Sequence, residues 1–351
     1  MPADPARGRA ENEPRTGRIR PGPAAAARDA GSDRTRRRRT RNLSAPTRAS
    51  PSRVAGDDPP AMTATNPPAR IVLALGAGGA RGVAHAAVLR GLRAARVPID
   101  AIVGCSVGAI VGAMHAAAGM EPDEMLQAAR RLNAMSLFAF ALSRWRVPVL
   151  SRAASRHAGA IPGYLERLER ASFERLHHGV RRLGVLTFDL KSREEVFLLG
   201  GPGLPSALPV CSAVKASAAI PALFPPLRAR LGGRKVLLAD AGWFTAVPVE
   251  RAFAPPLLAR RVIAVDLSLV VCLRQARRAY WRSLQETCGD RLLVLRPDVR
   301  GCGTMVSWPT DPDRLIAAAE DSVLRALPTL RAWLQEAAPG AAFLDSPGVS
   351  C

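Results

Sequence analysis

Histidine is scarce in this sequence, and its cysteines lack metal-binding spacing. The 351 residues include five histidines, none after residue 178, and six cysteines without a C-x-x-C pair. These spacings argue against a zinc site. They also disfavour the ordinary α/β-hydrolase order of nucleophile, acid and late histidine. That order would need an acid such as Asp123 before His157 or His177, in a region without a strand end.

No apolar stretch of the kind that marks a secretory signal lies near Met1. We therefore expect a cytoplasmic protein with reduced thiols, or one held peripherally at the inner face of the membrane. One uncharged run of 20 residues, 101–120, is long enough to span a bilayer. Glycines interrupt this run, and a strand, a turn and a buried helix account for it better.

Acidic residues are outnumbered by basic ones, which gives a net charge of +21. Residues 1–70 contribute +8 of this charge, with 15 Arg against 7 Asp and Glu, so the remainder of the chain is basic too. A basic surface suits phospholipid headgroups, including those of an anionic membrane, or nucleic acid. It can also serve solubility alone, and the composition leaves these alternatives open.

The composition divides the chain into three segments. Residues 1–68 are rich in Pro, Ala, Arg and Gly, which predicts a disordered tail. Its arginine run, 36–41, is interpreted as solvated, with nucleic acid or anionic lipid as the alternative. Residues 69–270 predict an ordered domain, and residues 271–351 predict a C-terminal strand and helices that complete the same domain.

Apolar runs and helical spacing alternate through the ordered part. A strand at 71–75, a helix from 83 to about 97, a strand at 101–103 and a helix at 106–118 form β-α-β-α units, which predict a parallel sheet with helices on its faces. Further along, we expect mostly helix over 121–182, a strand pair at 183–190 and 195–199, a short helix at 213–219, strands at 236–239, 262–267 and 292–295, and helices at 311–324 and 327–337.

Ser106 stands in a G-x-S-x-G pattern at the junction of a predicted strand and helix. This pattern holds a serine on a sharp turn with its hydroxyl exposed, and its other members are Gly104, Cys105, Val107 and Gly108. In a chain of this length the pattern arises by chance about one time in ten. A glycine-rich turn before it and a strand ending in Asp240 after it favour a serine hydrolase.

Asp240 follows a predicted strand and precedes the small-residue turn Ala241-Gly242. Because strand ends in open α/β sheets gather at one edge, we expect this carboxylate near Ser106. It could act as the base if burial raises its pKa toward neutrality. The alternative is an aspartate that only caps a turn.

The glycine-rich turn 76–82 offers donors for a developing negative charge. Its backbone N–H groups at a helix N-terminus predict an oxyanion hole of Gly78, Gly79, Ala80 and Arg81. A dinucleotide-binding G-x-G-x-x-G is disfavoured, because Arg81 replaces its last glycine. His85 and His115 are interpreted as structural.

Residues 73–82, 104–108 and 240–242 together resemble the bacterial patatin-like phospholipases. Three further blocks fit the family in order: TFDL at 187–190, ASAAIPALFPP at 216–226 and VIAVDL at 262–267. The resemblance covers about residues 70–270. It implies a three-layer α/β/α fold with a mainly parallel central sheet, with residues 69–270 as the catalytic domain.

The resemblance also implies a mechanism without metal or cofactor. Phospholipid or lysophospholipid would be the substrate, in lipid catabolism, with no nucleic-acid partner. A Ser-Asp dyad would hydrolyse the acyl ester, with Ser106 as nucleophile and Asp240 as base. Gly78, Gly79 and their neighbours would form the oxyanion hole.

Three departures separate this chain from the family pattern. The family usually has Gly in place of Ala77, D-G-G or D-G-A in place of D-A-G at 240–242, and Asn or Asp near Thr245-Ala246. These bear on substrate placement more than on the dyad. The alternatives are a catalytically weak basic protein on this fold that binds membrane or nucleic acid, and a small-ester or thioester hydrolase.

Overall fold

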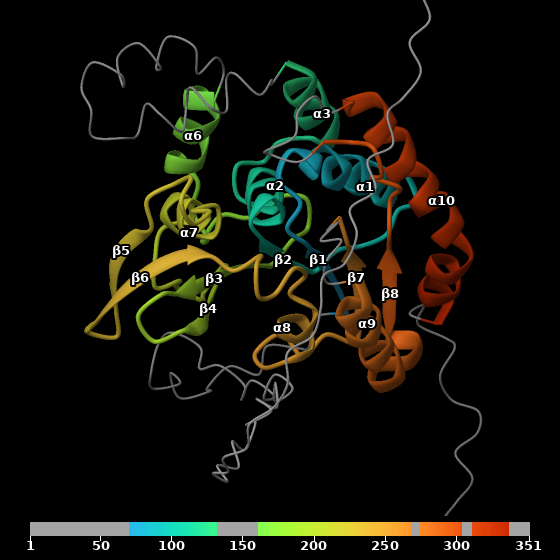
Figure 1. The fold of residues 1–351 in the computed structure, drawn as a ribbon. Helices are drawn as coiled ribbons and strands as arrows, with labels where there is room; N and C mark the ends of the chain where they lie inside the picture. The colour runs from blue at the N-terminus through green and yellow to red at the C-terminus, as the bar shows by residue number, and fades with distance from the viewer. Residues whose placement is uncertain (1–69, 132–160, 268–273, 304–310, 337–351) are drawn as a thin grey trace, which may run out of the picture. The chain divides into compact units, whose positions relative to one another are not determined.

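The computed structural model describes residues 70–131, 161–267, 274–303 and 311–336 (Figure 1). Short apolar segments of this part form one mixed sheet in the order β5-β6-β3-β2-β1-β7-β8, with β4 also paired to β3. Five strands run parallel to one another: β1 (Ile71–Leu75), β2 (Ala101–Cys105), β3 (Arg182–Asp189), β7 (Arg261–Val265) and β8 (Leu292–Leu295). The predicted β-α-β-α beginning and parallel centre are confirmed.

The rest of the sheet is antiparallel. β4 (Glu194–Gly200) pairs with β3 along one side, which confirms the predicted strand pair. β6 (Arg234–Asp240) runs antiparallel to β3, and β5 (Leu227–Leu231) forms a hairpin with β6. The sequence prediction missed β5, although Gly232-Gly233 between two strands is typical of a two-residue hairpin loop.

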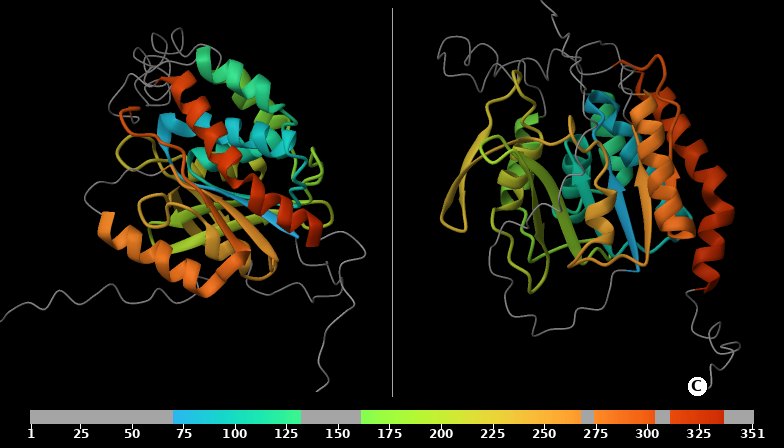
Figure 2. Two further views of the ribbon diagram at one scale, coloured as in Figure 1. Left: turned by 90° about the vertical axis from the view of Figure 1, so that its right-hand side faces the viewer. Right: turned by 60° about the horizontal axis from the view of Figure 1, so that its bottom comes forward.

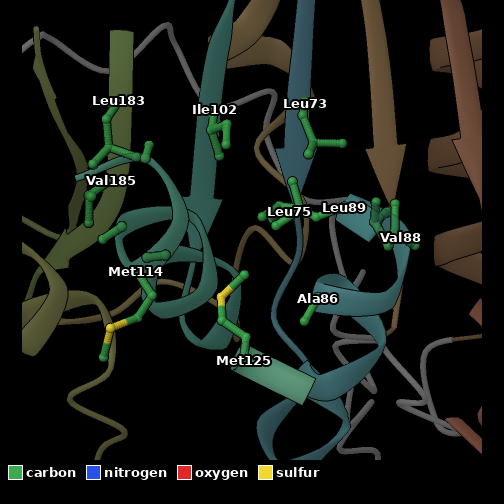
Figure 3. Close-up of a cluster of buried hydrophobic side chains, with 14 of the residues drawn as sticks. Leu73, Leu75, Ala86, Val88, Leu89, Ile102, Met114, Met125, Leu183 and Val185 are labelled. Carbon is green, nitrogen blue, oxygen red and sulfur yellow. The ribbon is translucent and has the colours of Figure 1, made fainter. Parts of the chain in front are cut away.

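Alternate residues of the central strands point to opposite faces of the sheet. In β1, Leu73 and Leu75 belong to one buried cluster, and Val72 and Ala74 belong to another. Figure 3 shows part of the first cluster, in which Leu73, Ile102 and Leu183 come from neighbouring strands. Two separate clusters mean that both faces are covered, as expected for a parallel sheet.

Two groups of helices cover these faces, as Figure 2 shows. α8 (Val249–Phe253) and α9 (Arg274–Cys288) lie on one side. The other side carries α1 (Val83–Ala94), α2 (Val107–Ala116), α3 (Pro122–Arg131), α6 (Ile161–Arg170), α7 (Val210–Ser217) and α10 (Pro312–Glu336). The three-layer α/β/α fold predicted from the sequence is therefore confirmed.

Some predicted elements were wrong. The two closing helices, 311–324 and 327–337, are the single helix α10, with Pro328 inside it. An internal proline costs about 3 kcal/mol, and continuous burial on both sides of it, at Val323, Leu330 and Trp333, offsets that cost. Residues 171–181 form turns instead of helix, and the prediction missed α8 and α9.

Several expectations fall outside this description. The predicted tail, 1–68, and residues 132–160 of the predicted helical region are not among the described residues. Within the described part of the chain, no helix is long and apolar enough to cross a bilayer. The uncharged run 101–120 forms β2, a sharp turn and α2.

Candidate active site

Ser106 occupies the turn between β2 and α2 in a strained conformation. Its φ of 55° and ψ of −124° are rare for a residue other than glycine, and such strain costs about 1–3 kcal/mol. Close packing explains the flanking glycines. A β-carbon at Gly104 would lie 2.5 Å from the backbone nitrogen of Ala109, and one at Gly108 would lie 2.2 Å from the Leu75 oxygen. The predicted nucleophile elbow therefore has the geometry of a tight strand–turn–helix junction.

Asp240 hydrogen-bonds directly to Ser106. The hydroxyl oxygen Oγ of Ser106 donates to Oδ2 of Asp240 at 2.5 Å. Both residues are nearly inaccessible, with 5 % of Ser106 and 4 % of Asp240 exposed. The structure thus brings together the two side chains that the sequence singled out, although they are 134 residues apart.

The route by which Asp240 reaches this place differs from the one predicted. Cys105, the last residue of β2, pairs with Leu186 of β3, and Asp240, the last residue of β6, pairs with Thr187. Because β4 occupies the other side of β3, β2 and β6 share one side and meet head to head. The Asp240 carboxylate therefore comes from the end of an antiparallel strand of the sheet, not from the end of a parallel strand.

The surroundings of Asp240 favour its neutral form. Burial raises the pKa of its carboxyl above the usual range, and hydrogen bonds from the Ser106 hydroxyl and the Gly242 N–H lower it less. A carboxylate with a raised pKa is a stronger proton acceptor than an exposed one. The adjacent thiol of Cys105 is fully buried, and burial raises its pKa well above the usual range, so it stays protonated.

Ser217 fixes the backbone of the elbow, and the sequence prediction assigned it no role. Its hydroxyl accepts a hydrogen bond from the Ser106 N–H at 2.9 Å and donates one to the Leu186 oxygen at 2.7 Å. Ser217 is completely buried. It lies in the ASAAIPALFPP block, so the family pattern was the one signal that pointed to it.

The glycine-rich turn packs against the elbow. A β-carbon at Gly82 would lie 2.0 Å from a methyl group of Val107. Gly79 and Ala80 line the same cavity as Ser106. The Arg81 N–H donates to the Gly78 oxygen at 3.2 Å, so this donor is occupied within the turn.

Two buried side chains hold this turn in place. The guanidinium of Arg81 donates to the backbone oxygens of Leu267, Cys302 and Gly303, and burial lowers its pKa. The His85 ring nitrogen Nε2 lies 2.7 Å from the Gly76 oxygen. Since that oxygen only accepts, Nε2 carries the proton. His85 therefore has a hydrogen-bond partner, the Gly76 oxygen, that fits the structural role predicted for it.

None of the four histidines in the described residues hydrogen-bonds to Ser106 or Asp240. Burial lowers the pKa of both His85 and His115 to about 4, so each ring is neutral near pH 7. His115 contacts the Met120 oxygen and stacks on His178. His157 lies outside the described residues.

Ser106 faces a largely apolar cavity of about 490 Å³. This volume falls within the usual range of small-molecule sites. Methionines and aliphatic or aromatic residues from α2, the loop after it, α3, α6 and the segment after α7 form most of its wall: Val111, Met114, Met120, Met125, Tyr164, Leu168, Ile220 and Phe224. Figure 3 shows Met114 and Met125 on the face of the sheet that carries this cavity.

Residues 73–253 match a protein-family model described as patatin-like phospholipase. An uncharacterized NTE family protein of Mycobacterium tuberculosis is 33% identical over 181 residues, which is 51% of this chain and 44% of that protein. Lysophospholipase NTE1 of Cryptococcus neoformans is 42% identical over 67 residues, 19% of this chain and 4% of that one. The matched part thus spans less than half the length of these relatives.

Among solved structures, VipD from Legionella pneumophila is similar with a TM-score of 0.43 and 13% identity, over 76% of this chain and 67% of that chain. The family match overlaps the residues 70–270 from which the resemblance was drawn. It includes the glycine-rich turn, the elbow with Ser106, and Asp240.

Proposed function

Since the chain belongs to the patatin-like phospholipase family, we propose that it is a serine hydrolase that cleaves acyl esters of phospholipid or lysophospholipid. Ser106 is the nucleophile and Asp240 the general base. The observation that carries the proposal is the 2.5 Å hydrogen bond between their side chains, on a strained elbow that faces an apolar cavity.

The first half of the reaction acylates Ser106. Its Oγ attacks the ester carbonyl carbon while Asp240 takes the hydroxyl proton. The carbonyl oxygen becomes an oxyanion, and we assign its stabilisation to the N–H groups of Gly78, Gly79 and Ala80. The Arg81 N–H is left out because it bonds to the Gly78 oxygen. The ester bond then breaks, and the proton on Asp240 passes to the leaving alcohol.

The second half releases the fatty acid. Water attacks the acyl-enzyme carbonyl, and Asp240 takes a proton from that water. The second tetrahedral intermediate collapses, and the proton returns from Asp240 to Ser106. One water is consumed, and one carboxylic acid and one alcohol form. The raised pKa of Asp240 suits both proton transfers.

The lining of the cavity supports a long acyl chain. Methionine, leucine and aromatic side chains offer no charge to the alkyl part of a substrate, and flexible methionines adapt to chains of different shape. The alternative of a small-ester hydrolase would gain little from this lining. We therefore expect turnover to rise with acyl-chain length.

Labelling by a fluorophosphonate serine probe tests the proposal. Wild type should be labelled, Ser106→Ala should not, and Asp240→Asn should react much more slowly while both variants stay folded by circular dichroism. Folded wild type that is not labelled would overturn the proposal and favour the catalytically weak binding protein. Fatty-acid release from phospholipid and lysophospholipid then identifies the substrate.

A further inference from the structure

Two adjacent aromatic side chains stand in solvent just after the catalytic base. Trp243 is 70 % exposed and Phe244 is 67 % exposed, the highest values among the large hydrophobic residues described. The other tryptophans of the described part, Trp281 and Trp333, are almost fully buried. Exposing two neighbouring aromatic rings to water is costly, so this pair calls for an apolar contact.

The aromatic pair belongs to the end of the sheet that carries the site. The ring of Phe244 stacks on Phe188 of β3, with centroids 4.2 Å apart. Two residues after Phe188, Leu190 begins the β3–β4 turn and is 39 % exposed. Trp243, Phe244 and Leu190 therefore mark the carboxyl end of β3, next to the residue pair Thr187 and Asp240.

Exposed cations adjoin this apolar group. We call them the basic hairpins: Lys191 and Arg193 in the β3–β4 turn, and Arg228, Arg230, Arg234 and Lys235 in the β5–β6 hairpin. Neither 190–193 nor 227–239 contains an acidic residue, and Glu194 is the first exposed carboxylate beyond them. The Leu190 N–H donates to the Leu237 oxygen, and the Lys191 ammonium to the Lys235 oxygen, so the two hairpins lie side by side.

The cavity that contains Ser106 is lined in part by one of these cations, Arg228. Of the residues that line it, the exposed ones are Pro225 and Arg228, at the start of β5. The β5–β6 hairpin, which Figure 1 shows at one edge of the sheet, therefore contributes to the wall of this cavity.

We propose that the aromatic pair and the basic hairpins together dock the protein on an anionic phospholipid bilayer. Tryptophan and phenylalanine favour the boundary between headgroups and acyl chains, and lysine and arginine are attracted to anionic headgroups. Docking in this orientation places the bilayer at the carboxyl end of β3, where Asp240 pairs with Thr187. The inference extends the proposed function, because it states how a water-insoluble substrate reaches Ser106.

Nucleic acid is the other polyanion that a basic hairpin can bind, and the observations favour it less. Phosphate contacts need cations alone and leave two exposed aromatic rings beside the site unexplained. A bilayer uses both features at once, since it combines negative charge with an apolar interior.

Vesicle co-sedimentation of the full chain tests the docking, with Ser106→Ala in every protein so that no lipid is hydrolysed. Vesicles of phosphatidylcholine are compared with vesicles that also contain phosphatidylglycerol, at low and high salt. Each basic residue near an anionic surface strengthens binding about fivefold. We therefore expect R234E/K235E to weaken binding to the anionic vesicles by at least about tenfold, and W243S/F244S to weaken it at any salt concentration.

Leu324 provides the matched control. It is 63 % exposed on α10, which packs beside β8 at the opposite end of the sheet from β5. Leu324→Ser should bind vesicles as well as the parent protein. The proposal is overturned if Leu324→Ser loses as much vesicle binding as R234E/K235E and W243S/F244S do. It is also overturned if neither of those two variants loses vesicle binding. So does binding of a DNA duplex that depends on Arg234 and Lys235 but not on Trp243, with no vesicle binding.

A soluble short-chain ester separates this inference from the proposed function. With Ser106 restored, R234E/K235E should hydrolyse the soluble ester as wild type does and lose activity only on vesicles. Vesicle binding without any ester turnover in wild type would overturn the hydrolase and leave the docking surface standing. Ester turnover with no vesicle binding would overturn the docking surface alone.

Discussion

The methyl group of Ala77 fills the space that a side chain at Gly242 would need. A β-carbon at residue 242 would lie 2.7 Å from that of Ala77 and 3.0 Å from Oδ1 of Asp240. Gly242 does not have a positive φ, so crowding and not backbone conformation requires glycine there. Two departures from the family pattern, Ala77 and the order D-A-G, are thus in direct steric contact.

This coupling predicts a rescue. Gly242→Ala should destabilise the protein by about 1–3 kcal/mol and slow labelling of Ser106, because overpacking displaces the N–H that bonds to Asp240. Ala77→Gly in the same chain should restore most of the lost stability and most of the labelling rate. Urea unfolding and probe-labelling rates of the two single variants and the double variant form the cycle. Equal effects of Gly242→Ala with and without Ala77 would show that the residues are independent.

Ser217 should act as a positioning residue for the elbow. Ser217→Ala leaves the buried Ser106 N–H and the Leu186 oxygen without their partner, which costs about 1–3 kcal/mol. It should also lower the labelling rate of Ser106 per folded molecule. Ser322→Ala is the control, since Ser322 is buried and donates to the Ala319 oxygen far from the site. Equal labelling rates in the two variants would contradict a positioning role.

Local patterns were enough for the elements around Ser106. An apolar run followed by G-x-S-x-G fixes a strand, a turn and a helix within about fifteen residues, and each prediction there needs contacts only between near neighbours. The prediction that Asp240 ends a strand also needed only the residues next to it in the sequence. The elements β1, β2 and α2 followed the sequence closely.

Long-range relationships could not be predicted in this way. That β6 meets β2 head to head depends on the pairing of both strands with β3, which joins Cys105 to Leu186, 81 residues apart, and Thr187 to Asp240, 53 residues apart. No local pattern reports the direction of β6. The contact of Ser217 with Ser106 joins residues 111 apart. The exposure of Trp243 and Phe244 also depends on the assembled fold, because aromatic residues after a strand are ordinarily buried.

The buried carboxyl of Asp240 should make the protein less stable at neutral pH than it would be without that charge. Its folded pKa is raised, so folding favours the protonated form, and stability is lost as pH rises through the folded pKa. Asp240→Asn removes the charge and keeps an oxygen for the Gly242 N–H. The variant should therefore gain in melting temperature over wild type at about pH 7.5, and the gain should shrink toward about pH 4.

The same raised pKa predicts the pH profile of labelling. The rate in wild type should rise with pH as Asp240 loses its proton, with a midpoint above the ordinary aspartate value of about 3.9. A rate that is flat from about pH 4 upward would contradict a raised pKa. Residual labelling of Asp240→Asn should lack this inflection.

The buried rings of His85 and His115 should both make the stability of the protein fall in acid. Burial holds the pKa of both rings at about 4, while the unfolded value is about 6.5. The unfolded chain therefore takes up protons first, and stability contributed by the neutral ring falls as pH drops from about 6.5 toward 4, by about 3 kcal/mol for His85. Unfolding by urea at several pH values should show a shallower decline in His85→Gln and in His115→Gln than in wild type.

Labelling of Ser106 then distinguishes the two positions. The His85 ring bonds to the Gly76 oxygen and so holds the glycine-rich turn, whereas His115 bonds to Met120 at the far end of α2. His85→Gln should slow labelling at about pH 7.5, and His115→Gln should not, although both change the pH dependence of stability in the same direction. If both variants labelled at the wild-type rate, the turn would hold its shape without the ring, and the contacts of Arg81 with Leu267, Cys302 and Gly303 would be sufficient to fix it.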